Sequence, residues 1–139
     1  MSNDIAIYDQ DGTVYNVKSY CTVDLSNYEG QKAVFNALND AEPLASHMGE
    51  VLSVKDVMLK PGTRRDRSTG VYVETINTYL FLVDGRALFS QSTGVLNAVV
   101  SLLTMHGDGF GDMPGGCVNL KCVEKQLANG NTLKTLVMA

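Results

Sequence analysis

A long β-branched segment followed by a tight turn constrains the fold of this chain more than any other feature. Residues 71–83 (VYVETINTYLFLV) are rich in Val, Ile, Thr and aromatic side chains, which predicts a long β-strand. The Asp84-Gly85 pair that follows is a signal for a tight turn, and residues 86–90 (RALFS) predict a returning strand. The centre of the chain is therefore expected to be a β-hairpin.

The polar sequence SQSTG follows this hairpin and leads into a predicted helix. Ser92 or Thr93 is a favourable residue to cap the helix, and Gly107 is expected to end it. A catalytic nucleophile elbow would need Gly-x-Ser-x-Gly, but Ser90 occupies the position of the first glycine. We therefore interpret SQSTG as a structural corner. The helix has an apolar face at helical spacing, formed by Val95, Leu96, Val99, Val100 and Leu103.

Three further strands are predicted around this centre. Residues 51–59 alternate between apolar and polar side chains, and a polar loop is expected at 62–70. Residues 117–126 and 132–138 predict a hairpin that turns at Asn129-Gly130. The resulting order is three strands, a helix and two strands. This is the order of the five-stranded OB-fold barrel, whose single helix lies between the third and fourth strands.

The first 48 residues are predicted to form an extension packed on a barrel domain at 49–139, with the whole chain one globular unit. Residues 5–17 indicate a hairpin around Asp11-Gly12. Residues 31–39 indicate a short helix. Its apolar side is expected to carry Val34, Phe35 and Leu38.

Neither a metal nor another cofactor is expected. Cys117 and Cys122 are five residues apart, so one regular strand would place them on opposite faces. The Gly-rich segment 107–116 contains no Gly-Lys-Ser/Thr and follows a helix, whereas a phosphate-binding loop follows a strand. The only histidines, His47 and His106, belong to no recognisable catalytic pattern. These observations argue against an enzyme.

The three cysteines form no disulfide framework, and we expect them to be reduced in a cytoplasmic protein. Neither a signal peptide nor a membrane-spanning segment is predicted, since no apolar run approaches the roughly 18 residues that a span requires.

Basic residues are concentrated in one part of an otherwise acidic chain. The formal net charge of −4 argues against a general basic coat for duplex DNA. Residues 55–67, however, carry five Lys or Arg against two Asp. Basic channels with aromatic stacking platforms are typical of proteins that bind single strands. Although Phe81 and Phe89 also suit a core, the predicted nucleic-acid site comprises Lys60, Arg64, Arg65, Arg67, Tyr72, Tyr79, Phe81, Arg86, Phe89 and Lys121.

Two motifs in the chain resemble a known family. The first runs from the Thr-rich strand through VDGRALFSQSTGVLNAVVSLL, and a terminal hairpin turned by ANGN follows it. The second is KAVFNALNDAEPL followed by GEVLSVKDV. Across residues 31–139 the chain resembles the single-stranded DNA-binding proteins of small protein-primed Bacillus phages and related Gram-positive mobile elements.

This resemblance implies an OB-fold that coats and protects single-stranded DNA during phage or mobile-element replication, without catalysis. The motifs match the family at Tyr79, Phe81, Arg86, Phe89 and Lys121, whereas local charge alone supports the loop arginines. Replication proteins and further copies of the chain are additional expected partners. Two alternatives stay open: a β-barrel that binds protein and no nucleic acid, and an OB-type module that binds RNA.

Overall fold

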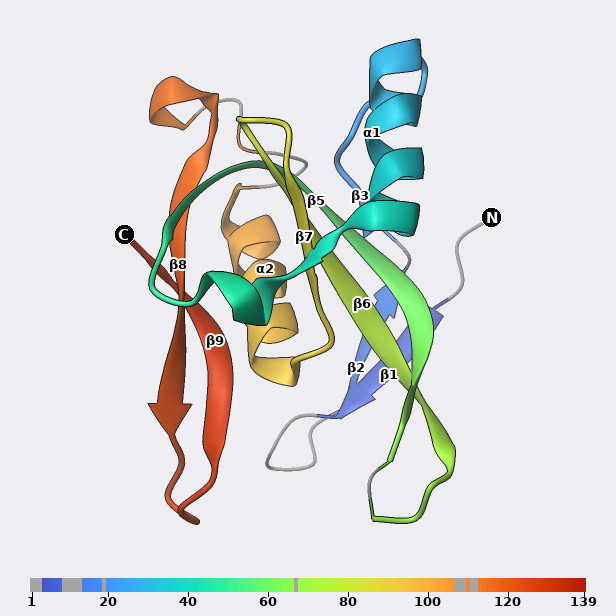
Figure 1. Ribbon diagram of the computed structural model, residues 1–139, viewed down its shortest axis with the longest axis vertical. Coiled ribbons are helices and arrows are strands. Elements are labelled where there is room, and N and C mark those ends of the chain that lie inside the picture. The colour runs from blue at the N-terminus through green and yellow to red at the C-terminus, as the bar shows by residue number, and fades with distance from the viewer. Residues whose placement is uncertain (1–3, 9–13, 19, 67, 107–109, 111–112) are drawn as a thin grey trace.

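A computed structural model describes residues 4–8, 14–18, 20–66, 68–106, 110 and 113–139. In this part of the chain the protein is mainly β, with a seven-stranded sheet that curls around one of two α-helices (Figure 1). The elements, in chain order, are β1 (Asp4–Tyr8), β2 (Val14–Lys18), β3 (Tyr20–Cys21), α1 (Tyr28–Asp40), β4 (Glu42–Pro43), η1 (Leu44–His47), β5 (Val51–Arg65), β6 (Tyr72–Leu82), β7 (Ala87–Ser90), α2 (Thr93–His106), η2 (Pro114–Gly116), β8 (Val118–Gln126) and β9 (Thr132–Met138).

Strand β5 connects the two halves of the sheet. Its first residues, Val51–Val54, pair with β8, and its remainder pairs with β6. The register shifts between Val54 and Asp56, where the strand passes from one partner to the other. Such an irregularity bends a strand and increases its twist. The sheet can therefore curl around α2 instead of staying flat.

The N-terminal segment contributes more to this sheet than the sequence indicated. Short strand β3 pairs with the middle of β5, and β4 pairs in parallel with β7. The described sheet therefore has seven strands, in the order β4-β7-β6-β5-β8-β9 with β3 beside β5, and not the five of the predicted barrel. Strands β1 and β2 form the predicted hairpin as a separate two-stranded sheet, although its turn lies outside the described residues.

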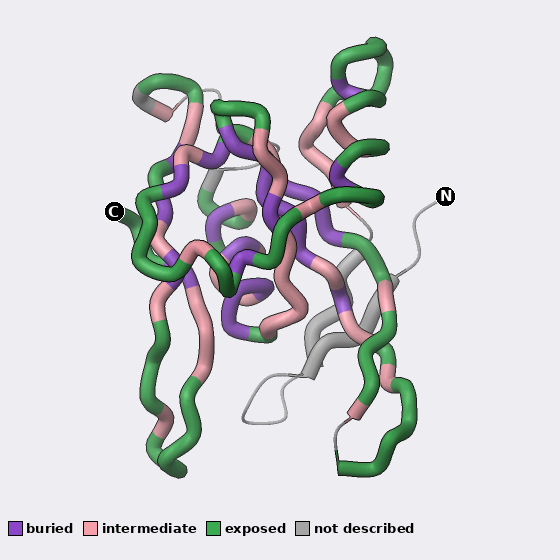
Figure 2. The backbone as a smooth tube through the Cα atoms, viewed as in Figure 1, coloured by how far each residue is buried: buried purple, intermediate pink, exposed green. Residues whose placement is uncertain are grey.

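The main core lies between α2 and the concave side of the curled sheet. Val95, Leu96 and Val99 of α2 are buried against strand residues such as Leu80 and Leu120. Figure 2 shows buried positions concentrated along α2 and the strands around it. The apolar face predicted for this helix therefore supplies much of the core. No helix of the described chain is long and apolar enough to cross a membrane.

The SQSTG corner joins α2 to the last strand. The Ser92 hydroxyl donates to the Lys134 carbonyl of β9 at 2.8 Å, and the Thr135 hydroxyl donates to the Gly94 carbonyl at 3.2 Å. Strands β7 and β9 are not paired in the described sheet. The beginning of α2 is therefore bound to β9, an edge strand of this sheet, and SQSTG is a structural corner as predicted.

Gly94 is required at this corner because β9 passes very close to it. A Cβ added to Gly94 would lie 2.2 Å from the Lys134 carbonyl oxygen and 2.8 Å from Leu133 Cγ. The first of these atoms belongs to the backbone and cannot move aside as a side chain can. Only glycine lets the helix and the strand approach in this way.

We expect Gly94→Ala to lower the free energy of unfolding by about 1–3 kcal/mol, the usual cost of overpacking a well-packed site. Urea denaturation of both proteins measures the change. Thr93→Ala is the control, because Thr93 is exposed and should change stability by less than about 0.5 kcal/mol. If Gly94→Ala were as stable as Thr93→Ala, the close contact with β9 would be refuted.

Candidate nucleic-acid interface

The ends of β5 and β6 form a two-stranded arm. We call residues 60–65 and 72–77 the β5–β6 arm; its pairs run from Lys60↔Asn77 to Arg65↔Tyr72. Strands β3 and β7 pair with β5 and β6 only before this point, so the arm has no third strand among the described residues. The arm projects from the sheet (Figure 1). The polar loop predicted from residue 62 is thus strand as far as Arg65.

The cationic side chains of the arm lie on both of its faces. Cross-strand partners share a face and successive residues alternate, so Lys60 and Arg64 lie with Asn77 on the face that continues to Tyr79. Arg65 and its partner Tyr72 lie on the opposite face. All four predicted site residues of the arm are exposed, and Tyr72 is 70% exposed. Arg67, the remaining arginine of the predicted cluster, lies outside the described residues.

Two amide side chains that the sequence analysis did not select brace the base of the arm. The Gln91 side-chain amide donates to Asn77 Oδ1 at 2.9 Å and to the Thr63 carbonyl at 3.2 Å. Gln91 belongs to the SQSTG corner, so the same five residues position both the arm and β9. Alternation along the predicted strand places Asn77 on the same face as Tyr79, and this was the only sequence signal that Asn77 belongs near the site.

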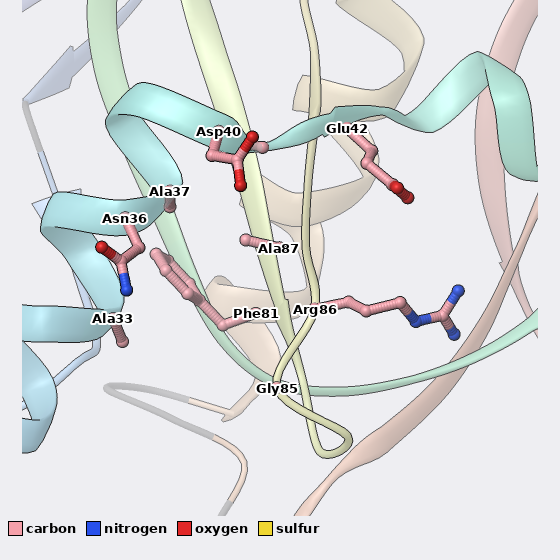
Figure 3. Close-up of a pocket in the computed structure, with 10 residues that line it drawn as sticks. Ala33, Asn36, Ala37, Asp40, Glu42, Phe81, Gly85, Arg86 and Ala87 are labelled. Atoms are coloured by element: carbon pink, nitrogen blue, oxygen red, sulfur yellow. The ribbon is translucent and has the colours of Figure 1, made fainter.

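Three aromatic residues of the predicted site lie under helix α1. Tyr79 is 8% exposed and Phe81 is 4% exposed, and both belong to a second core cluster with Met58 and Ala37. Phe89 packs against this cluster, with its ring centroid 6.1 Å from that of Tyr79. Figure 3 shows the Phe81 side chain pointing from the sheet toward α1. In this conformation the rings of Tyr79 and Phe81 are closed to a nucleic-acid base.

The charge of Arg86 is already paired with two carboxylates. Its Nε donates to Asp84 Oδ2 at 2.8 Å, and Nη2 donates to Glu50 Oε1 at 2.9 Å. Hydrogen bonds from His47 and then Arg86 lower the pKa of Glu50, and the backbone N–H of Arg86, followed by its guanidinium, lowers that of Asp84. Arg86 is therefore less available to a phosphate than the arginines of the arm.

Lys121 lies away from the arm, on strand β8. It pairs across the sheet with Val51 of β5 and Val137 of β9, and its side chain is half-buried. Valines on both sides can cover the aliphatic stem of a lysine while its ammonium group stays in water. The structure thus places Lys121 in a different part of the surface from Lys60 and Arg64.

The described residues form a mainly β protein with one cationic, aromatic-bearing arm. Among them, no three His, Cys, Asp or Glu side chains are grouped to hold a metal ion. The described residues of the predicted site fall into four environments: the exposed arm, the surface under α1, the Arg86 ion pairs beside the β6–β7 turn, and the sheet around β8.

Comparison with known proteins gives the family. The family described as phage single-stranded DNA-binding protein, of the Phi29 type, matches residues 13–139, and the chain belongs to it. The single-stranded DNA-binding protein of Bacillus phage GA-1 is 32% identical over 108 residues, which are 73% of this chain and 62% of that relative. No solved structure matches the chain. The resemblance to the phage family is therefore confirmed.

His47 lies between two glutamates, one of which, Glu50, is also paired with Arg86. His47 Nδ1 lies 2.8 Å from Glu50 Oε2, and Nε2 lies 2.8 Å from Glu42 Oε2. Neutral imidazole carries a single N–H, so it can donate to both carboxylates only when protonated. The hydrogen bond to Glu50, followed by that to Glu42, raises the pKa of His47 above its ordinary value of 6.5.

We expect the stabilisation that His47 provides to be complete below pH 6.5 and to be lost as the pH rises through the raised pKa of the folded state. Free energies of unfolding of wild type and His47→Gln, measured from pH 6 to 9, test this. The advantage of the wild type should shrink with increasing pH. Two curves that stay parallel would contradict a protonated His47 between the two glutamates.

Proposed function

We propose that this protein is a non-enzymatic single-stranded DNA-binding protein that coats and protects single strands during phage or mobile-element replication, with little sequence preference. The observation that carries the proposal is the β5–β6 arm, which exposes Lys60 and Arg64 on one face and Arg65 with the ring of Tyr72 on the other. Membership of the phage family supports it.

The arm offers the two interactions that single-strand binding needs. Lys60, Arg64 and Arg65 neutralise phosphates, and each neutralised phosphate releases counterions from the strand. Tyr72 stacks on a base, an interaction worth about 1–3 kcal/mol that any base can make. Both interactions are independent of sequence, which suits a protein that covers whichever strand replication exposes.

The order of the elements supports an OB-type barrel as the scaffold. Strands β5, β6 and β7, helix α2, and strands β8 and β9 follow the order of that fold. The arm then corresponds to the connection between the first two barrel strands, and the β8–β9 turn to that between the last two. OB-folds bind oligonucleotides with these two connections and the face of their second and third strands. In Figure 1 both hairpins project toward the same end of the molecule.

Replication proteins and further copies of the chain are proposed as additional partners, and the proposed binding needs no cofactor. The first experiment is fluorescence anisotropy of labelled oligo-dT at low and moderate salt, with duplex DNA and RNA as competitors. Salt-sensitive binding that prefers single-stranded DNA is the expected result. Preference for RNA would instead identify an RNA-binding module. Absence of binding at low salt would favour a protein-interaction module.

The salt dependence of binding should distinguish the arm from Arg86. Replacing Arg64 by Gln removes one exposed phosphate partner, so the slope of log K against log[salt] should become shallower by about 0.7. The same substitution at Arg86 removes a charge already paired with Asp84 and Glu50, so it should change the slope less. Titrations of both variants at four salt concentrations measure the slopes. If both variants changed the slope equally, Arg86 would contact the DNA strand as the arm does.

Tyr72→Ala should weaken binding of oligo-dT by about 5- to 150-fold, which corresponds to about 1–3 kcal/mol for one stacked base. Tyr72→Phe keeps the ring and should bind as the wild type does. Because Tyr72 is exposed, neither change should affect the unfolding midpoint much. Wild-type affinity in Tyr72→Ala would remove this ring from the interface.

A further inference from the structure

Helix α1 covers the sheet face that an OB-type barrel uses for its ligand. That face lies on the second and third barrel strands, here β6 and β7. Tyr79 and Phe89 are cross-strand partners on it, and Phe81 lies two residues further along β6 on the same side. The three rings form one aromatic surface on these two strands. Instead of facing solvent, this surface packs beneath α1.

The helix contacts this surface mainly through small side chains. Ala33, Ala37 and Ala41, together with Val34, pack against the aromatic cluster. The larger apolar residues of the helix point away: Tyr28 and Phe35 are 71% and 68% exposed, and Leu38 is also exposed. The sequence had placed Phe35 and Leu38 on the packing side, and this interpretation was wrong. Alanine methyl groups bury little apolar area, so the contact holds the helix weakly.

Hydrogen bonds do not compensate for this limited contact. Within the described chain, the hydrogen bonds of α1 stay inside the helix or join it to the preceding residues, as Gly30 joins Asn27 and Gln31 joins Leu25. No described ion pair joins α1 to the strands.

Open pockets also border the contact between α1 and the sheet. Their volumes are about 240 and 450 Å³, and Ala33, Asn36, Phe81 and Gly85 line both. Figure 3 shows the smaller pocket. Solvent therefore reaches the edge of this contact.

We propose that α1 is a displaceable cover, and that single-stranded DNA takes its place on Tyr79, Phe81 and Phe89. This inference rests on the proposed function and adds a regulation of the same site. Bases can stack on an aromatic surface of this kind. The alanine methyl groups that now cover it make a smaller contact with the rings. A 13-residue helix detached from a sheet is marginal in water, so displacement also unfolds it. The observed association constant is then the intrinsic constant multiplied by the fraction of molecules whose aromatic face is open.

Hydrogen exchange with and without saturating oligo-dT tests the displacement directly. The amides of α1 should exchange faster in the complex, and those of the β5–β6 arm more slowly. The amides of α2, on the other side of the sheet, should keep their rates. Unchanged or slower exchange in α1, in a protein that does bind oligo-dT, would overturn the cover while leaving the proposed function intact. Absence of binding by the wild type would overturn both.

A pair of matched substitutions tests the energetic link. Ala33→Gly destabilises the helical state of α1 and should tighten oligo-dT binding by about fivefold, the fold-change equivalent to the ~1 kcal/mol cost of glycine in a helix. Ala98→Gly makes the same exchange in α2, which does not cover the aromatic surface, and should leave the affinity unchanged. Unchanged or weaker binding by Ala33→Gly would refute the cover.

Discussion

The contact between the SQSTG corner and its neighbours is the interaction on which the rest of the structure depends. The edges of the described sheet are β9 and β4, which lies beside β7, so backbone hydrogen bonding alone leaves the curled sheet open between these edges. Ser92 and Gly94 close this gap by binding β9, while Gln91 reaches the β5–β6 arm on the other side. A shift of this corner would therefore move both hairpins relative to the core. The five residues of SQSTG thus hold neighbouring elements together, although their sequence is similar to that of a catalytic nucleophile elbow.

Much of the fold could be predicted because local signals agree with it. The helix at Thr93–His106 has a complete apolar face, and the hairpins coincide with their Asp-Gly and Asn-Gly turns. The secondary structure was predicted wrongly or missed where contacts between distant segments determine it. Residues 62–65 were predicted to begin a loop because the segment is polar, yet pairing with β6 makes them strand. The two-residue strands β3 and β4 are too short to leave any pattern.

The candidate site was predictable in its composition but less so in its geometry. Charge density along the sequence pointed to the arm, although alternation along the strands divides Lys60 and Arg64 from Arg65 and Tyr72. The partners of Arg86 include Glu50, which is 36 residues away and belongs to no motif. The burial of Tyr79 and Phe81 depends on a helix whose larger apolar residues point outward. Each of these differences arises from contacts between segments that are distant in sequence.

The uneven distribution of charge gives the two sides of the protein opposite polarity. The arm is positive, whereas Glu42, Glu50 and Asp84 lie around His47 and Arg86 and the chain as a whole is acidic. Such a separation is an electric dipole, which turns the arm toward a polyanion and the acidic side away from it. In the proposed function, a strand of DNA is attracted to the arm and repelled from the acidic side, so the protein lies on the strand in one orientation.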